Sequence, residues 1–156
     1  MRRLPVHAAL VAAASALLLA ACAPDYSIEE PVDYDGYARE LFDLTNDLRA
    51  DEGVGTLEWN DCLAQTAEPR AQTASTLEYL EHEPMTPSCT EGNMIGENLV
   101  RDERNPAGLF DRWVNSASHY QNLVNPGWEV SGIACVPSDQ GPTCSQLFEG
   151  VAPVPE

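Results

Sequence analysis

Lysine is absent from this chain of 156 residues, and only eight arginines stand against 25 aspartates and glutamates. The formal net charge at pH 7 is −17. Binding to a phosphate backbone depends on basic side chains that neutralise charge and release counterions. The composition therefore argues against nucleic acid as a partner, and against adsorption to anionic lipid through charge alone.

Motifs that mark common enzymes and metal proteins are also missing. The chain contains no CxxC pair, no HExxH and no GxSxG. The first two spacings are typical of zinc sites, and the third is typical of the nucleophile of α/β-hydrolases. A zinc site or a catalytic serine would have to be assembled without them.

The one long apolar run lies at the N-terminus, where Ala8 to Leu19 follows two arginines and precedes Cys22. We interpret residues 1–21 as a lipoprotein signal peptide, because the run is too short to span a membrane comfortably and small residues precede the cysteine. The sequence LAAC resembles the lipobox of bacterial lipoproteins, which implies that Cys22 is acylated. An ordinary cleaved signal that leaves Cys22 free is the alternative. Either cleavage leaves six arginines against 25 acids, a net charge of −19.

Composition divides the rest of the chain into three parts. Residues 22–35 are acidic, contain proline and show no period, which predicts a solvated tether. Residues 36–150 carry the periodic patterns and suffice for one domain. Residues 151–156 are predicted to be a disordered tail.

Two amphipathic patterns predict helices in the first half of the domain. Apolar residues at steps of four and three indicate a helix over residues 36–49. A second helix is expected from Asp61 to about Leu80, with Asn60 as its N-cap and a face of small residues. Pro69 lies inside this pattern, and we expect it to kink the helix or split it in two.

Trp113, Ser116 and His119 follow at steps of three, which would place them on one face of a third helix that begins near Pro106. The run Asn125-Pro126-Gly127 ends that helix at a turn. Strands are predicted over residues 128–136 and 143–149. A histidine is therefore expected a few residues before a corner between helix and strand.

Four cysteines remain after Cys22, an even number that predicts two disulfides in an exported chain. Three pairings are possible. The pairing of Cys135 with Cys144 is favoured, because both lie in strands joined by a turn-rich segment, and it leaves Cys62 with Cys89. The second bridge closes the longer loop and would stabilise the fold by about 3 kcal/mol in the chain-entropy model.

A series of motifs resembles the CAP superfamily, also called the SCP domain. It begins with LTNDLRADEGVGTLEWNDCLAQTA at residues 44–67 and continues with His82, Gly96-Glu97-Asn98 and Trp113. Ser116-x-x-His119, Gly132 and SQLF at residues 145–148 complete it. The resemblance covers about residues 37–150. It implies an α+β fold, an alpha-beta-alpha sandwich with a small antiparallel sheet.

The resemblance also implies a cleft, which in eukaryotic members contains two histidines and two acids. His82 and Glu97 match one of each. Ser116 stands where the second acid lies, and no histidine stands near Thr143, where the second histidine lies. His119 matches the serine-x-x-histidine helix of bacterial members. The candidate cleft therefore consists of His82, Glu97, Ser116 and His119.

Two chemistries are open for these four residues. His82, His119 and Glu97 could ligate zinc or another divalent cation, with a water in the fourth position as a source of hydroxide. The alternative is a polar network that ties loops to the sheet. Ser116 and His119 could belong to a serine hydrolase, but the sequence places no acid to orient the imidazole.

A ligand-binding role is also open, because Trp59, Trp113 and Trp128 could line an apolar pocket. We expect Trp113 and Trp128 to be core residues instead. The overall prediction is a monomeric, lipid-anchored, extracytoplasmic binding or interaction module at the cell envelope, which requires no cofactor. Its partners would be the membrane, through the N-terminal lipid, and a protein or an apolar small molecule. A metal-dependent hydrolase and a lipid or sterol carrier are the alternatives.

Overall fold

The computed structural model describes residues 24–28 and 31–152, so the predicted signal peptide and Cys22 lie outside the described residues. The described chain forms the helices α1 (Tyr34–Asp51), α2 (Asp61–Thr76), α3 (Pro106–Val114) and α4 (Ala117–Leu123). Its strands are β1 (Glu58–Trp59), β2 (Met94–Arg101), β3 (Trp128–Val136) and β4 (Thr143–Gly150). In these ranges, none of the helices has the length and apolar character needed to cross a bilayer.

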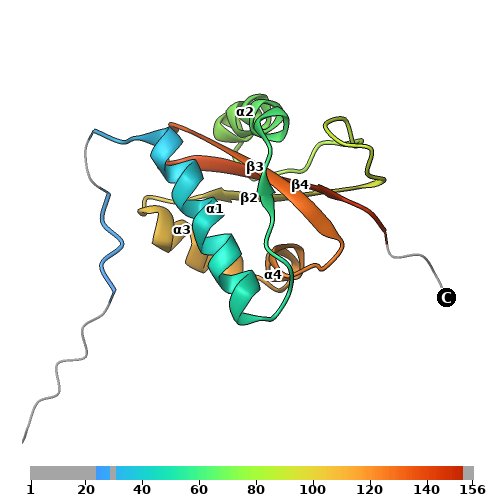
Figure 1. The fold of residues 1–156 in the computed structure, drawn as a ribbon. Coiled ribbons are helices and arrows are strands. Elements are labelled where there is room, and N and C mark those ends of the chain that lie inside the picture. Colours follow the sequence, from blue (N-terminus) through green and yellow to red (C-terminus); the bar gives the residue numbers. More distant parts are fainter. Residues whose placement is uncertain (1–23, 29–30, 153–156) are drawn as a thin grey trace, which may run out of the picture.

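The strands form one sheet in the order β1-β3-β4-β2. The three long strands pair antiparallel, and the short β1 joins the edge of β3 in parallel, which makes the sheet mixed. Helix α2 covers one face, and α1, α3 and α4 cover the other (Figure 1). The predicted α+β sandwich is confirmed.

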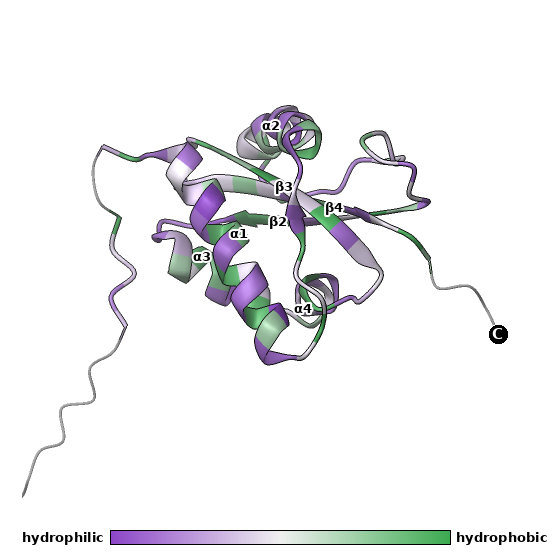
Figure 2. Ribbon diagram, in the orientation of Figure 1, coloured by the Kyte–Doolittle hydropathy of each residue, from purple (hydrophilic) through white to green (hydrophobic). Residues whose placement is uncertain are grey.

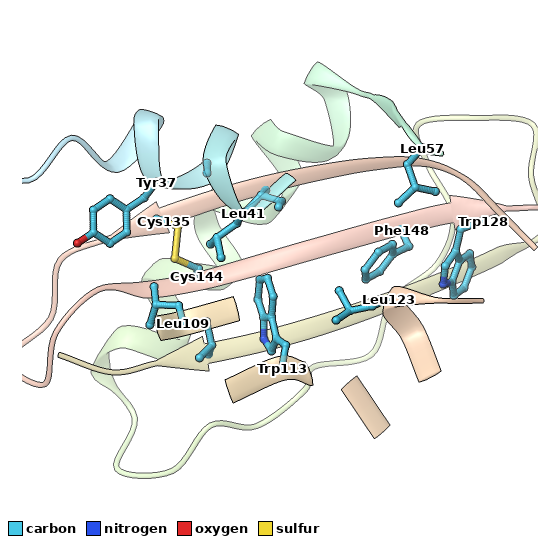
Figure 3. Close-up of a cluster of buried hydrophobic side chains, with 13 residues drawn as sticks. Tyr37, Leu41, Leu57, Leu109, Trp113, Leu123, Trp128, Cys135, Cys144 and Phe148 are labelled. Atoms are coloured by element: carbon cyan, nitrogen blue, oxygen red, sulfur yellow. A yellow bond between two sulfur atoms is a disulfide. The ribbon is translucent and has the colours of Figure 1, made fainter. Parts of the chain in front are cut away.

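Helix α1 buries one face against the sheet and α3. The N-cap Asp33 accepts a hydrogen bond from the Gly36 amide, so the helix begins two residues before the predicted start. Purple and green residues both occur along α1 (Figure 2), and its buried face combines the apolar Tyr37, Ala38 and Leu41 with the polar Thr45 and Arg49. Leu41, Trp113 and Phe148 point into the buried cluster that joins these layers (Figure 3). Apolar burial on this face therefore holds three of the four helices to the sheet.

Pro69 was predicted to kink α2 or split it in two, and the split does not occur, because α2 runs through Pro69 as a single helix. Pro69 and Gln65 are both exposed, so water can bond the carbonyl that the missing proline amide leaves unpaired. The helix ends at Thr76, four residues before the predicted end. It packs close to β3, because a Cβ on Gly132 would meet the backbone of Leu63 at 2.6 Å.

The prediction of one helix through Trp113, Ser116 and His119 is also wrong. Ser116 has φ −107° and ψ 119° and is the N-cap of α4, a separate helix. The side chain of Asn115 donates to the Asp111 carbonyl at 2.8 Å, a local bond that competes with helix continuation. Trp113 is therefore fixed in the core on α3, while His119 is placed independently on α4.

Both predicted disulfides are confirmed. Cys62 pairs with Cys89, and Cys135 pairs with Cys144. The first bridge ties the start of α2 to the loop that precedes β2. The second joins paired positions on β3 and β4.

The predicted tether and tail are less separate from the domain than expected. Asp25 and Tyr26 hydrogen-bond to Asn105 at the start of α3, so this part of the tether is not free in solvent. At the other end, the amide of Ala152 donates to the side chain of Asn93 at 2.8 Å. Residues 153–156 of the predicted tail lie outside the described residues.

Candidate functional site

Glu97 is the centre of the site, and three side chains donate to its carboxylate. Arg70 Nε lies 2.6 Å from Oε1, and Arg70 Nη2 lies 2.9 Å from Oε2. The Ser145 hydroxyl donates to Oε1 at 2.8 Å, and His82 Nδ1 lies 2.7 Å from Oε2. Only 1% of the Glu97 side chain is exposed. The carboxylate is therefore both buried and fully hydrogen-bonded.

Each partner of Glu97 comes from a different element. Glu97 lies on β2, and Ser145 lies on the neighbouring β4, two pairs along the ladder and on the same face. Arg70 reaches down from α2, where the buried Ala67 and Ala71 leave room for its long side chain. His82 belongs to the loop at residues 77–93. The site thus joins helix, sheet and loop.

The loop that carries His82 is fixed at both ends. Near its start, the Arg101 guanidinium donates to the Leu77 carbonyl at 2.6 Å. Near its end, the buried carboxylate of Glu149 accepts from the Ser88 amide at 2.7 Å and from the Thr90 hydroxyl at 2.8 Å. These contacts limit the positions that His82 can reach.

Hydrogen bonding determines the charge state of Glu97. Burial by itself raises the pKa of this carboxyl, but the bonds from Arg70, His82 and Ser145 outweigh burial, and the pKa lies below its ordinary value. Glu97 is therefore ionised at neutral pH. An anion here stabilises the donor form of His82 Nδ1, and the rest of this half-exposed side chain is open to solvent.

His119 lies close enough to His82 for the two rings to affect each other. Burial lowers the pKa of His119, and the charge that His82 can carry lowers it further. The backbone of His119 is tied to the sheet, because its carbonyl accepts from Asn98 Nδ2 at 3.2 Å. Asn122 Nδ2 bonds Asn98 Oδ1 at 2.9 Å. Glu97 and Asn98 are successive residues of the edge strand β2, so His82 contacts a side chain on one face of this strand and the His119 carbonyl contacts a side chain on the other.

Ser116 takes a different role from the one that a nucleophile requires. It occupies the N-cap position of α4 without a side-chain capping bond, and the hydrogen-bond partner of its hydroxyl in the described chain is the Ser118 hydroxyl at 3.4 Å. The His82 ring bonds Glu97, and in the described residues the Ser116 hydroxyl bonds Ser118 and not an imidazole. The arrangement offers no Ser–His pair for proton transfer.

A metal would compete with Arg70 for Glu97. Within the described residues, no group of three or more His, Cys, Asp or Glu side chains is arranged to hold a metal ion. The guanidinium already bonds both oxygens of the carboxylate, which is the position that a cation would take. The donor set therefore does not fit zinc, which needs three protein ligands in an open site.

Arg70 is the site residue that sequence analysis missed. It follows Pro69 on α2, and the pattern that predicted this helix was its face of small residues, to which Arg70 does not belong. The sequence offers one indication of its role. A buried carboxylate needs a cationic partner, and after residue 21 the chain has only six arginines and no lysine to supply one. Asn98 and Asn122 were missed too, since nothing in their spacing pairs them.

The tryptophans do not line an apolar pocket together. Trp113 and Trp128 are buried at 0% and 6% exposure. Trp59 lies in a groove of about 410 Å³ between α1 and α2, where the Arg39 guanidinium stacks 3.7 Å from its ring centroid. Asp61 accepts from the indole nitrogen at 2.7 Å. This groove is polar and separate from the histidine site.

The sequence matches the model of the cysteine-rich secretory protein family, CAP, over residues 42–148. The chain belongs to the CAP family. The Bacillus subtilis protein YkwD is 26% identical over 129 residues, which cover 77% of this chain and 49% of YkwD. This chain therefore spans about half of that relative's length.

Solved structures share the CAP fold at lower sequence identity. An extracellular protein of Bacillus anthracis that contains an SCP domain is 21% identical, with a TM-score of 0.64 over 78% of this chain and 45% of that one. An outer surface protein of Borrelia burgdorferi is 19% identical, with a TM-score of 0.63 over 78% of this chain and 97% of that one. These likenesses support the fold.

Replacing Glu97 tests the buried ion pair. We expect Glu97→Gln to lower the free energy of unfolding at pH 7 by about 3–5 kcal/mol, because it leaves the Arg70 charge buried without its partner. The depressed pKa means that the carboxylate stabilises the fold above its ordinary pKa of about 4.3, and that this contribution is lost as pH falls through the folded pKa. Urea unfolding across pH measures both effects.

The exposed Glu91 offers a matched control. Glu91→Gln removes the same charge and should change stability by less than about 0.5 kcal/mol. Equal effects of the two substitutions, or a Glu97→Gln effect that persists undiminished at acid pH, would contradict the importance of the pair.

Titration of His119 tests whether the imidazoles share a site. By NMR, the pKa of His119 should lie below the ordinary value of about 6.5, and it should rise in His82→Gln while staying low, because burial remains. Since protonation then favours the unfolded chain, stability should begin to fall as pH drops below about 6.5. An unchanged His119 pKa in His82→Gln would show that the rings do not interact. Asp139→Asn, on the distant β3–β4 turn, is the control.

Proposed function

We propose that this protein is a lipid-anchored, extracytoplasmic CAP module that binds a ligand through the surface around His82 and His119, and that it is not a hydrolase. The observation that carries this proposal is the saturation of Glu97 by Arg70, His82 and Ser145. A carboxylate so occupied orients His82 but cannot also ligate a metal. The exposed imidazole is then a recognition group.

The exposure of His82 agrees with recognition. Its side chain is 52% exposed, while the Glu97 carboxylate that orients it is buried. An imidazole held from beneath at Nδ1 presents Nε2 to solvent in a fixed direction. A partner with a hydrogen-bonding or acidic group would meet a preorganised contact there.

The location of the module rests on two supports. The N-terminal residues have the pattern of an export signal that ends in LAAC. The solved relatives include proteins described as extracellular and as an outer surface protein. We infer that Cys22 carries acyl chains, each buried methylene of which contributes about 0.8 kcal/mol to membrane attachment.

Metabolic labelling tests the anchor. In bacteria that process lipoproteins and are fed an alkynyl fatty acid, the full chain should carry the label and sediment with membranes. Cys22→Ser should lose the label and leave the membrane fraction, while Ala23→Ser next to it should keep both. A wild-type chain without label, or a labelled Cys22→Ser chain, would refute the anchor.

Calorimetry with zinc tests whether the protein is a ligand-binding module or a metal-dependent hydrolase. The chain from residue 22 with Cys22→Ser should give the same zinc heat before and after His82→Ala, because Arg70 occupies the carboxylate. Asp139→Asn controls for loosely held zinc on the acidic surface. Heat that disappears in both His82→Ala and His119→Ala, and persists in the control, would favour the metal-dependent hydrolase.

A further inference from the structure

The start of the described chain is fastened to one end of the domain. The backbone amide of Asn105 donates to the Tyr26 carbonyl at 2.9 Å, and Asn105 Nδ2 donates to the Asp25 carbonyl at 3.1 Å. The Arg104 guanidinium lies 5.3 Å from the Tyr26 ring centroid. Three contacts therefore fix where the chain leaves the domain, beside the first turn of α3.

The surface of α3 fits this segment. A Cβ on Gly108 would stand 3.0 Å from the Tyr26 Cβ, closer than ordinary contact. Gly108 is buried although it lies on a short helix near the surface. A Cβ here would also stand 2.7 Å from the Arg104 Cβ, so a larger residue would disturb both Arg104 and Tyr26, and the glycine permits their contact.

Little chain separates this contact from Cys22. Two residues, Ala23 and Pro24, lie between Cys22 and Asp25, so the two end Cα atoms are at most about 11 Å apart. If Cys22 is acylated, as the proposed function holds, its acyl chains enter the bilayer within that distance of Asp25. The start of α3 must then lie close to the lipid headgroups.

Two further segments share this end of the domain. The Asp102 amide, just after β2, donates to the Pro142 carbonyl at 3.4 Å. The turn between β3 and β4 thereby lies against the segment that leads into α3. We name residues 101–108 and 137–142 the membrane-proximal end. The C-terminal end of the chain leaves the domain on the opposite side (Figure 1).

The charge distribution also favours contact between the membrane-proximal end and the lipid headgroups. The membrane-proximal end contains two arginines, Arg101 and Arg104, and three acids, Asp102, Glu103 and Asp139, so its net charge is −1. Asp102 accepts from Arg112 Nε at 2.6 Å and lies 3.3 Å from Arg104 Nε. In a chain with a net charge of −19, an end with a net charge of −1 is repelled only weakly by anionic headgroups.

We propose that the membrane-proximal end rests on the headgroup layer, so that the domain stands on the membrane in one orientation. Strand β2 then rises from the membrane, with Arg101 low and Met94 high. Glu97 lies about 13 Å above Arg101 along this strand. The histidine site therefore faces sideways above the headgroups, within reach of partners at the membrane surface.

Paramagnetic NMR on a chemically anchored chain tests this orientation. The other four cysteines are paired, so the Cys22 thiol of a chain that starts there can be coupled to a maleimide lipid. The coupled protein is placed on nanodiscs of phosphatidylcholine and phosphatidylglycerol, with a gadolinium-chelating or a lutetium-chelating headgroup. Amide relaxation at Glu103 and Gln140 should exceed that at Glu91 and Gly127 by about an order of magnitude, because β2 separates the ends by about 23 Å.

A longer tether provides the contrast. A Gly-Ser insert of about 16 residues after Pro24 has a root-mean-square span of about 22 Å and should make the relaxation similar at both ends. Equal relaxation at both ends of the original chain would overturn the proposal, as would an unchanged bias in the insert variant. Because the lipid is attached chemically, these results do not depend on acylation in cells, which the labelling of Cys22 tests separately.

Discussion

A carboxylate with 1% of its side chain exposed can remain ionised only if donors replace the water that it has lost. Glu97 meets this condition through Arg70, His82 and Ser145, which belong to a helix, a loop and a strand. Removing any one donor would leave part of the charge unsatisfied. The buried carboxylate therefore adds a polar link among three segments that also meet through the packing of α2 on β4, the Cys62–Cys89 disulfide and the bonds of the loop to Glu149, and the position of His82 depends on that link.

Two other buried charges act on neighbouring loops in the same way. Glu149 is fully buried on the same face of the sheet and accepts from the backbone of Ser88 and Cys89. Arg49, fully buried on α1, donates to the Leu123 carbonyl at 2.8 Å and to the Asn125 carbonyl at 3.0 Å. The apolar cluster attaches helices to the sheet, whereas these charges fix the loops. The two kinds of contact differ because loops carry backbone N–H and C=O groups that have no partner in a helix or sheet. Polar groups can bond them, whereas apolar packing cannot.

The sequence predicts those features that depend on period or on local chemistry. The bounds of β3 agree with the structure, and the disulfides follow from cysteines placed on paired strands and at a loop. Features that depend on a distant partner were not predictable. Arg70 belongs to the site because its guanidinium bonds the Glu97 carboxylate. Tyr26 is held against the domain because the backbone amide of Asn105 donates to its carbonyl. The break at Ser116 was missed because the step of three suggested one continuous helix, whereas Asn115 ends it locally.

The use of arginine limits what the site can recognise. Arg49 and Arg101 bond backbone carbonyls, Arg70 bonds Glu97, and Arg104 and Arg112 bond Asp102. These cations hold the fold together, so they add little positive charge to an acidic surface. After residue 21, His82 and His119 are the only histidines, and an imidazole can gain charge near neutral pH. Burial and the neighbouring ring both oppose charge on His119. A ligand with an acidic group would reverse part of that opposition, so its binding should be coupled to proton uptake at His119.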